Sequence, residues 1–177
     1  LQQEIDPQKY GSCFPTTSLE SEYPNVHKSR LAWCYGDLGV AISLWRAGCS
    51  TNNEKWKTKA LDTFNFASTR RNMEENSVID GQLCHGTSGI AQVFRRMYFE
   101  TGNYNYMDTS NYWIKKTLEI ATWEDGFAGY KFLTGYPNSS WNGDCSFLEG
   151  IAGIGLALIA SIGDSEYSAW DEFLLLS

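Results

Sequence analysis

Apolar residues recur along the chain in three short runs, and each run follows a Gly-x-x-Gly step. The spacing and length of these runs predict helices over 39–47, 87–100 and 151–162. Gly48 and Gly102 are expected to end the first two. The third run contains almost no polar residue, so we expect a buried helix there. The three steps are Gly36-Asp37-Leu38-Gly39, Gly86-Thr87-Ser88-Gly89 and Gly150-Ile151-Ala152-Gly153.

A second class of segment is amphipathic and follows each of the first two apolar runs. Residues 53–71 and 108–122 carry apolar side chains at a spacing of three to four, which predicts helices with one wet face. Each unit then holds an inner apolar helix and an outer amphipathic helix. Residues 123–146 are rich in Gly, Asn, Ser and aromatics without helical period, which indicates a long loop with a short hairpin around 127–133.

The recurrence of this two-helix unit predicts an all-α helical repeat array. Gly36 and Gly86 are 50 residues apart and Gly86 and Gly150 are 64 apart, with the excess in the long loop. We divide the chain into an irregular lead-in or linker over 1–30 and a repeat domain over 31–177. The repeats are expected at about 31–80, 81–145 and 146–177. Because the chain lacks an initiator Met, we expect it to begin inside a longer chain or after processing.

Composition and charge limit which partners the chain could bind and which cellular compartment it could occupy. The chain has 177 residues, 42% hydrophobic and 15% aromatic, which is enough for one domain with a real core. Its net charge of −7 and the lack of a basic run argue against nucleic acid and anionic membrane surfaces. The longest apolar stretch is too short to span a bilayer. Five cysteines, an odd number, without a dense framework fit a reducing compartment, so we expect the cytoplasm.

Cysteine and histidine stand at the entry of the first two apolar helices. Cys84 and His85 precede one helix, and Cys34 occupies the matching place in the unit before it. If the inner helices pack side by side, these three side chains meet at one rim. Two thiolates and an imidazole favour Zn²⁺ over Mg²⁺ or Ca²⁺, and three protein ligands leave a fourth position open, as in catalytic zinc sites.

Plainer interpretations compete with this one. Buried free cysteine is common, and a Cys-His pair by itself is weak evidence for a metal. The matching position of Cys34 strengthens the metal interpretation. Cys13, Cys49 and Cys145 are taken as bystanders, and His27 lies in the irregular lead-in. Neither a phosphate-binding Gly-Lys-Ser/Thr sequence nor a convincing Ser-His-Asp set accompanies the glycines.

At these residues the sequence resembles the lanthionine synthetase C family of cyclases. Trp33-Cys34-Tyr35-Gly36 and Cys84-His85-Gly86 are similar to the family's zinc-binding motifs, and the repeated glycine steps are similar to the inner helices of its α/α toroid. The end of the chain, 170–176, also resembles the family's C-terminus. The resemblance covers the last three of seven repeats. The family's remaining acid/base residues, an Asp and a His, lie in the earlier repeats and are absent here, so we expect a zinc site in a catalytically incomplete fragment.

The resemblance implies a Zn²⁺ bound by Cys34, Cys84 and His85. It implies Michael addition of a peptide cysteine thiolate to a dehydroalanine or dehydrobutyrine, which gives a thioether ring. Arg30, four residues before the first zinc cysteine, matches a family arginine and would steady the enolate oxyanion or an acidic partner. Tyr35 matches a position important in the family and would donate a hydrogen bond.

Three functions therefore compete. The first is the cyclase, whose partners would be a dehydrated cysteine-containing peptide and a dehydratase. The second is the binding or addition of glutathione-like thiols at the same zinc. The third is a non-catalytic helical-repeat scaffold in which the Cys-His cluster is structural. Open repeat faces also predict self-association.

Overall fold

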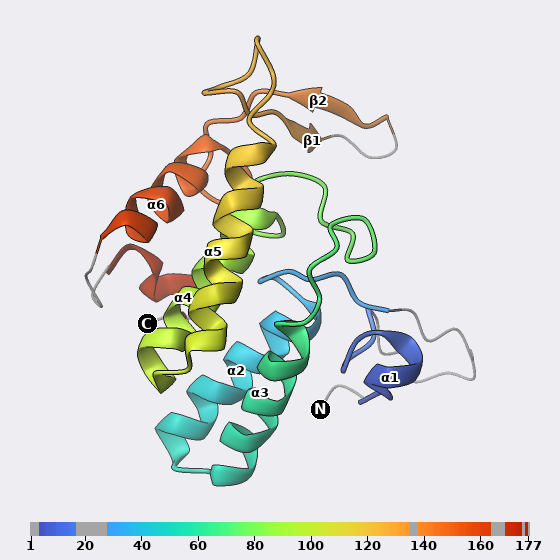
Figure 1. The fold of residues 1–177 in the computed structure, drawn as a ribbon, viewed down its shortest axis with the longest axis vertical. Helices are drawn as coiled ribbons and strands as arrows, with labels where there is room; N and C mark the ends of the chain where they lie inside the picture. Colours follow the sequence, from blue (N-terminus) through green and yellow to red (C-terminus); the bar gives the residue numbers. More distant parts are fainter. Residues whose placement is uncertain (1–3, 17–27, 135–137, 164–168, 175, 177) are drawn as a thin grey trace. The chain divides into compact units, whose positions relative to one another are not determined.

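The computed structural model describes residues 4–16, 28–134, 138–163, 169–174 and 176 (Figure 1). The chain divides into two compact units, 1–77 and 78–177. Most of the described residues are helical, as the sequence predicts. None of the helices among them has the length and apolar character that crossing a bilayer requires. The repeat boundaries near 80 and 145 stay predictions.

The first unit is built on a helical hairpin of α2 (Gly36–Thr51) and α3 (Glu54–Ala67), which run antiparallel (Figure 1). Asn52 adopts a left-handed conformation with φ 52°, and the side chain of Asn53 accepts hydrogen bonds from the first turn of α3. The prediction that Gly48 ends the first helix is wrong. Gly48 lies against the backbone of Lys57, so its missing side chain serves close helix packing instead of termination.

The lead-in is partly folded. A short helix, α1 (Pro7–Tyr10), begins after Asp6, whose carboxylate accepts from the Gln8 N–H. Ser12, Cys13 and Phe14 are buried. Residues 17–27, including His27, lie outside the described residues.

The second unit packs α4 (Thr87–Thr101) against α5 (Tyr104–Glu119) and α6 (Ile151–Ile162). Most of α4 is buried, in agreement with its apolar sequence, and its place as an inner helix of the array stays a prediction. The helix predicted over 108–122 begins four residues earlier. Asn103 supplies an N-cap by accepting from the Asn105 N–H, and Gly102 ends α4 with φ 69°.

The long loop holds a hairpin, displaced from the predicted position. Strand β1 (Phe132–Thr134) pairs antiparallel with β2 (Ser140–Asn142), with Leu133 opposite Trp141. Within the predicted 127–133 segment, Phe127 and Tyr130 form an isolated bridge. Tyr130, Phe132 and Ile154 share a small core that joins this loop to α6.

The prediction that α6 is buried is wrong on one face. Gly153, Ile154 and Ala157 are buried, whereas Ile159 and Ile162 are 65% and 85% exposed. An apolar run signals burial only when partners cover all sides of the helix, and here α4 and the hairpin core cover one side.

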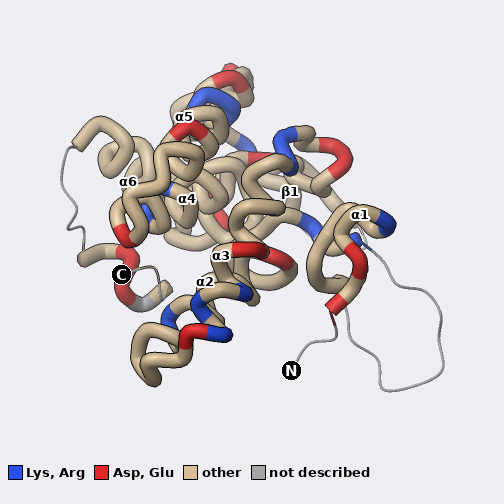
Figure 2. Tube along the Cα trace, turned by 60° about the horizontal axis from the view of Figure 1, so that its bottom comes forward, with Lys and Arg blue, Asp and Glu red and all other residues tan. Residues whose placement is uncertain are grey.

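The C-terminal 3₁₀ segment η1 (Ala169–Leu174) is joined to α4 by a buried ion pair. Asp171 is fully buried and accepts from Arg96 at 2.6 Å and from the Gln92 amide at 2.5 Å. Elsewhere, α3 and α5 each carry both lysines and acidic residues (Figure 2).

Candidate metal centre

The three loops that lead into α2, α4 and α6 share one geometry. In each, the first glycine of the step lies against the carbonyl oxygen six residues earlier, and a Cβ there would sit 2.6 Å from that oxygen. Real Cβ atoms do not approach so closely, so each loop requires glycine at this point. The three pairs are Gly36 with Arg30, Gly86 with Asp80, and Gly150 with Asp144.

The second glycine of each step, three residues later, also lies against a carbonyl oxygen six residues before it. A Cβ at Gly39 would lie 2.6 Å from the Trp33 carbonyl oxygen. At Gly89 and Gly153 it would overlap the carbonyl oxygens of Leu83 and Phe147. The loops therefore correspond residue by residue, with Cys34 equivalent to Cys84 and to Leu148.

Cys84 and His85 lie together on the loop before α4. Both side chains are partly buried, and their ligand atoms lie within 4.8 Å of one another. The Cys84 N–H donates to the Leu148 carbonyl at 2.9 Å, which fixes this loop against the loop before α6. A thiol and an imidazole held side by side on a braced backbone suit a borderline-soft cation.

An aspartate organises the backbone just before this pair. Asp80 accepts from the Gln82 N–H at 3.1 Å and from the Gln82 side-chain amide at 2.9 Å. Asp144 accepts from the Ser146 N–H in the same way. These side-chain-to-backbone turns let the second and third loops hold their own shape.

The first loop departs from this pattern because its equivalent residue is Arg30. Arg30 Nη2 donates to the Ser77 carbonyl at 2.5 Å. Its Nε is buried and has no hydrogen-bond partner among the described residues. The first loop therefore has an arginine where the other two loops have a turn-forming aspartate.

Cys34 and Tyr35 follow on the same loop, and both are exposed. Tyr35 is the N-cap of α2 in an extended conformation, and Gly36 has φ 77°. Cys34 belongs to the first unit and Cys84 and His85 to the second. The convergence of the three residues on one ion stays a prediction, as do the roles of Arg30 and Tyr35.

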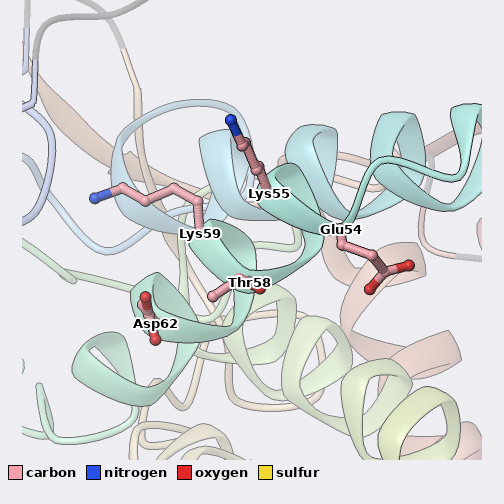
Figure 3. Close-up of a pocket in the computed structure, with 5 residues that line it drawn as sticks. All are labelled: Glu54, Lys55, Thr58, Lys59 and Asp62. Carbon is pink, nitrogen blue, oxygen red and sulfur yellow. The ribbon is translucent and has the colours of Figure 1, made fainter.

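The remaining cysteines differ in environment. Cys13 is buried, and burial together with the nearby Asp37 charge raises the pKa of its thiol to about 11. Cys49 and Cys145 are exposed. A surface pocket on α3, lined by Glu54, Lys55, Thr58, Lys59 and Asp62, includes none of the predicted site residues (Figure 3).

Two residues next to the first loop escaped the sequence analysis, Asp37 and Arg70. Asp37 is fully buried in the first turn of α2 and pairs with Arg70 at 2.8 Å. A charged residue between the two glycines of the step was the available signal, because the other two steps carry uncharged residues there.

This architecture defines a helical-hairpin repeat protein with cysteine and histidine at helix entries. The family model described as lanthionine synthetase C-like protein matches residues 3–175, so the chain belongs to the lanthionine synthetase C-like family.

Two comparisons agree with this assignment. The chain is 28% identical over 151 residues to the nisin biosynthesis protein NisC of Lactococcus lactis subsp. lactis, covering 83% of this chain and 31% of that protein. Its fold is similar to that of nisin cyclase, with a TM-score of 0.60 and 22% identity over 89% of this chain and 34% of the other. The chain therefore spans about a third of the length of these relatives, and it shares their toroid-type helical fold.

Proposed function

We propose that the chain carries the zinc-binding part of a lanthionine cyclase, with Cys34, Cys84 and His85 as the ligands. The observation that carries this is the Cys84–His85 pair on a loop whose geometry recurs around Cys34. Membership of the family and the likeness to NisC support the cyclase-type role. Two thiolates and one imidazole fit Zn²⁺ and leave a fourth position for a substrate thiol.

Zinc, when bound, supplies a cation that keeps a coordinated peptide thiol deprotonated near neutral pH. The proposed reaction adds a cysteine sulfur to the β-carbon of a dehydroalanine or dehydrobutyrine in the same peptide. The carbon–carbon double bond of the dehydro residue becomes a single bond, a carbon–sulfur bond forms at its β-carbon, and the proton lost by the thiol is balanced by one gained at the α-carbon. The atoms of the peptide are conserved, and the product is a thioether ring.

Arg30 and Tyr35 are the residues of this chain proposed to assist the addition. The guanidinium of Arg30 donates to the Ser77 carbonyl through Nη2, and its positive charge would stabilise negative charge on the enolate oxygen. The exposed phenol of Tyr35 would donate a hydrogen bond to the peptide. The substrate would be a dehydrated cysteine-containing peptide supplied by a dehydratase in the cytoplasm, where thiols remain reduced.

A second function uses the same site for glutathione-like thiols. It shares the zinc, the ligands and the open position, so thiol binding alone does not separate it from the cyclase. The third candidate, a repeat scaffold with a structural metal or none, requires a fourth protein ligand or an empty site.

The experiment replaces zinc by cobalt(II), whose absorption reports thiolate ligands. Adding a cysteine-containing peptide to the cobalt-loaded chain should raise the thiolate-to-metal absorption, and His85→Ala should lose the response. A spectrum indifferent to added thiol would favour the scaffold.

A dehydrated peptide with one cysteine and one dehydroalanine then separates the first two functions. Ring formation protects the peptide thiol from alkylation, which mass spectrometry detects. Thiol binding without such protection, for both the peptide and glutathione, would favour the glutathione-type function.

A further inference from the structure

A buried ion pair between Asp37 and Arg70 lies at the ends of the loop that leads into α2. The Asp37 carboxylate is fully buried and accepts from the backbone N–H groups of Cys13 and Phe14 at 3.0 Å. It also accepts from Arg70 Nη1 at 2.8 Å. Arg70 is itself 6% exposed. All of these contacts lie within the first unit.

Arg70 extends this contact to the other end of the loop. Its Nη2 donates to the Ser29 carbonyl at 2.5 Å, and its Nε donates to the Asn76 side chain at 2.9 Å. Ser29 precedes Arg30, and Asp37 follows Tyr35 by two residues. One ion pair thus joins the two ends of the segment that carries Arg30, Cys34 and Tyr35.

The 70–77 segment adds two further contacts to the same loop. The Leu31 N–H donates to the Asn76 carbonyl at 3.1 Å, and Arg30 donates to the Ser77 carbonyl. The backbone on each side of Cys34 is therefore held by residues outside the loop.

The other two loops have no charged residue at the position of Asp37. At the position of Asp37 they have Thr87 and Ile151, and at the position of Arg30 they have the turn-forming Asp80 and Asp144. The first loop has Arg30 where the other two loops have the turn-forming aspartate. Its ends are held by the Asp37–Arg70 ion pair instead of by such a turn.

We propose that Asp37 and Arg70 are positioning residues, which set the place of Cys34 and Arg30 for metal binding and thiol addition. The inference rests on the proposed function. A buried ion pair is weak evidence for a gain in stability alone, because desolvating both charges costs about as much as their attraction returns. Because the Asp37–Arg70 pair contacts both ends of this loop, it would fix the position of the loop backbone.

The test is the cobalt(II) spectrum and the zinc affinity of Asp37→Asn. Asparagine keeps an oxygen for the Cys13 and Phe14 N–H groups but loses the charge that pairs with Arg70. The ligand-field bands of cobalt should change shape, and zinc affinity should fall by about ten- to a hundredfold, as for other residues that orient ligands from outside the coordination shell.

Asp171→Asn is the matched control, because it alters an equally buried Asp–Arg pair of the second unit. It should lower thermal stability while leaving the cobalt spectrum unchanged. Should Asp37→Asn fail to fold by circular dichroism, Arg70→Lys takes its place. Lysine keeps the charge but offers one nitrogen for the acceptors of Asp37, Ser29 and Asn76, so the same spectral change is expected.

A folded variant with an unaltered spectrum and unaltered zinc affinity would overturn the positioning role. Equal spectral changes in the Asp171→Asn control would also overturn it, since they would trace the effect to general destabilisation. Failure of the wild-type chain to bind cobalt would instead refute the proposed function, and this inference with it.

Discussion

Gly89 lies so close to Leu83 that any side chain at Gly89 would overlap the Leu83 carbonyl oxygen. The contact joins the first turn of α4 to the residue immediately before Cys84. The same contact recurs between Gly153 and Phe147 and between Gly39 and Trp33. The glycine step therefore fixes where the residue after that carbonyl lies, and in two of three loops that residue is a cysteine.

Gly89→Ala should destabilise the second unit by about 3 kcal/mol, because backbone must shift to admit the methyl group. Gly155→Ala is the matched control on α6, where a Cβ meets no atom within 4 Å. It should stabilise the helix by about 0.5–1 kcal/mol through helix propensity. Urea unfolding followed by circular dichroism measures both. Equal effects of the two substitutions would contradict the close-contact explanation.

Arg30→Asp should restore the local turn seen at Asp80 and Asp144. We expect this variant to unfold at the same temperature as the wild type or higher, while thiol addition to a dehydrated peptide is lost. Arg30→Ala, which cannot form the turn, should lose the activity without gaining stability. Retained activity in Arg30→Asp would refute a role for the guanidinium in the reaction.

Cys13 should resist alkylation at pH 8, whereas the exposed Cys49 and Cys145 should react readily. Its pKa of about 11 leaves almost no thiolate at that pH. Mass spectrometry after a short exposure to iodoacetamide identifies the labelled residues. Labelling of Cys13 at the rate of Cys49 in the folded chain would show that the thiol is not buried.

The same raised pKa makes stability depend on alkaline pH. Below the unfolded-state pKa of about 8.5, the Cys13 thiol is protonated in both states and the dependence vanishes. As pH rises from there towards 11, only the unfolded chain ionises, so the folded state loses stability. Cys13→Ala should flatten this part of the curve, measured by thermal unfolding. An unchanged slope would assign the alkaline loss to other groups.

Ile159→Lys should reduce self-association, because Ile159 is an exposed apolar side chain of α6. Light scattering at increasing concentration measures the mean mass. The exposed Thr58, changed to Lys on α3, controls for added charge. A wild-type chain that stays monomeric at high concentration would contradict the predicted association.

Periodicity and the glycine steps predicted α2 to α6 to within four residues at each end, and local chemistry explains where the bounds differ. Apolar runs placed α4 and α6 within a residue or two of their bounds, because propensity, glycine steps and period agree there. The start of α5 was missed although Tyr106 lies seven residues before Trp113 on the same buried face, and the Asn103 cap marks where the helix begins. The end of α2 was mispredicted at Gly48, because the sequence does not distinguish a glycine that allows close helix packing from one that ends a helix.

The site was predictable only in part. Cys84 and His85 are adjacent in sequence, and the repeat placed Cys34 in an equivalent loop. The Asp37–Arg70 pair spans 33 residues, and no local pattern relates a first-turn aspartate to an arginine after the next helix. Such long-range polar contacts follow from the folded chain and cannot be read from periodicity.

The central claim is that Cys34, Cys84 and His85 hold one zinc ion, and metal content tests it most directly. Elemental analysis of the chain purified without chelator should find about one zinc per chain, lost in Cys84→Ala and in Cys34→Ala. Cys145→Ala, which removes an exposed cysteine of the third loop, should retain the metal. A folded wild-type chain without zinc, or full zinc in Cys84→Ala, would contradict the claim and leave the repeat scaffold as the better account.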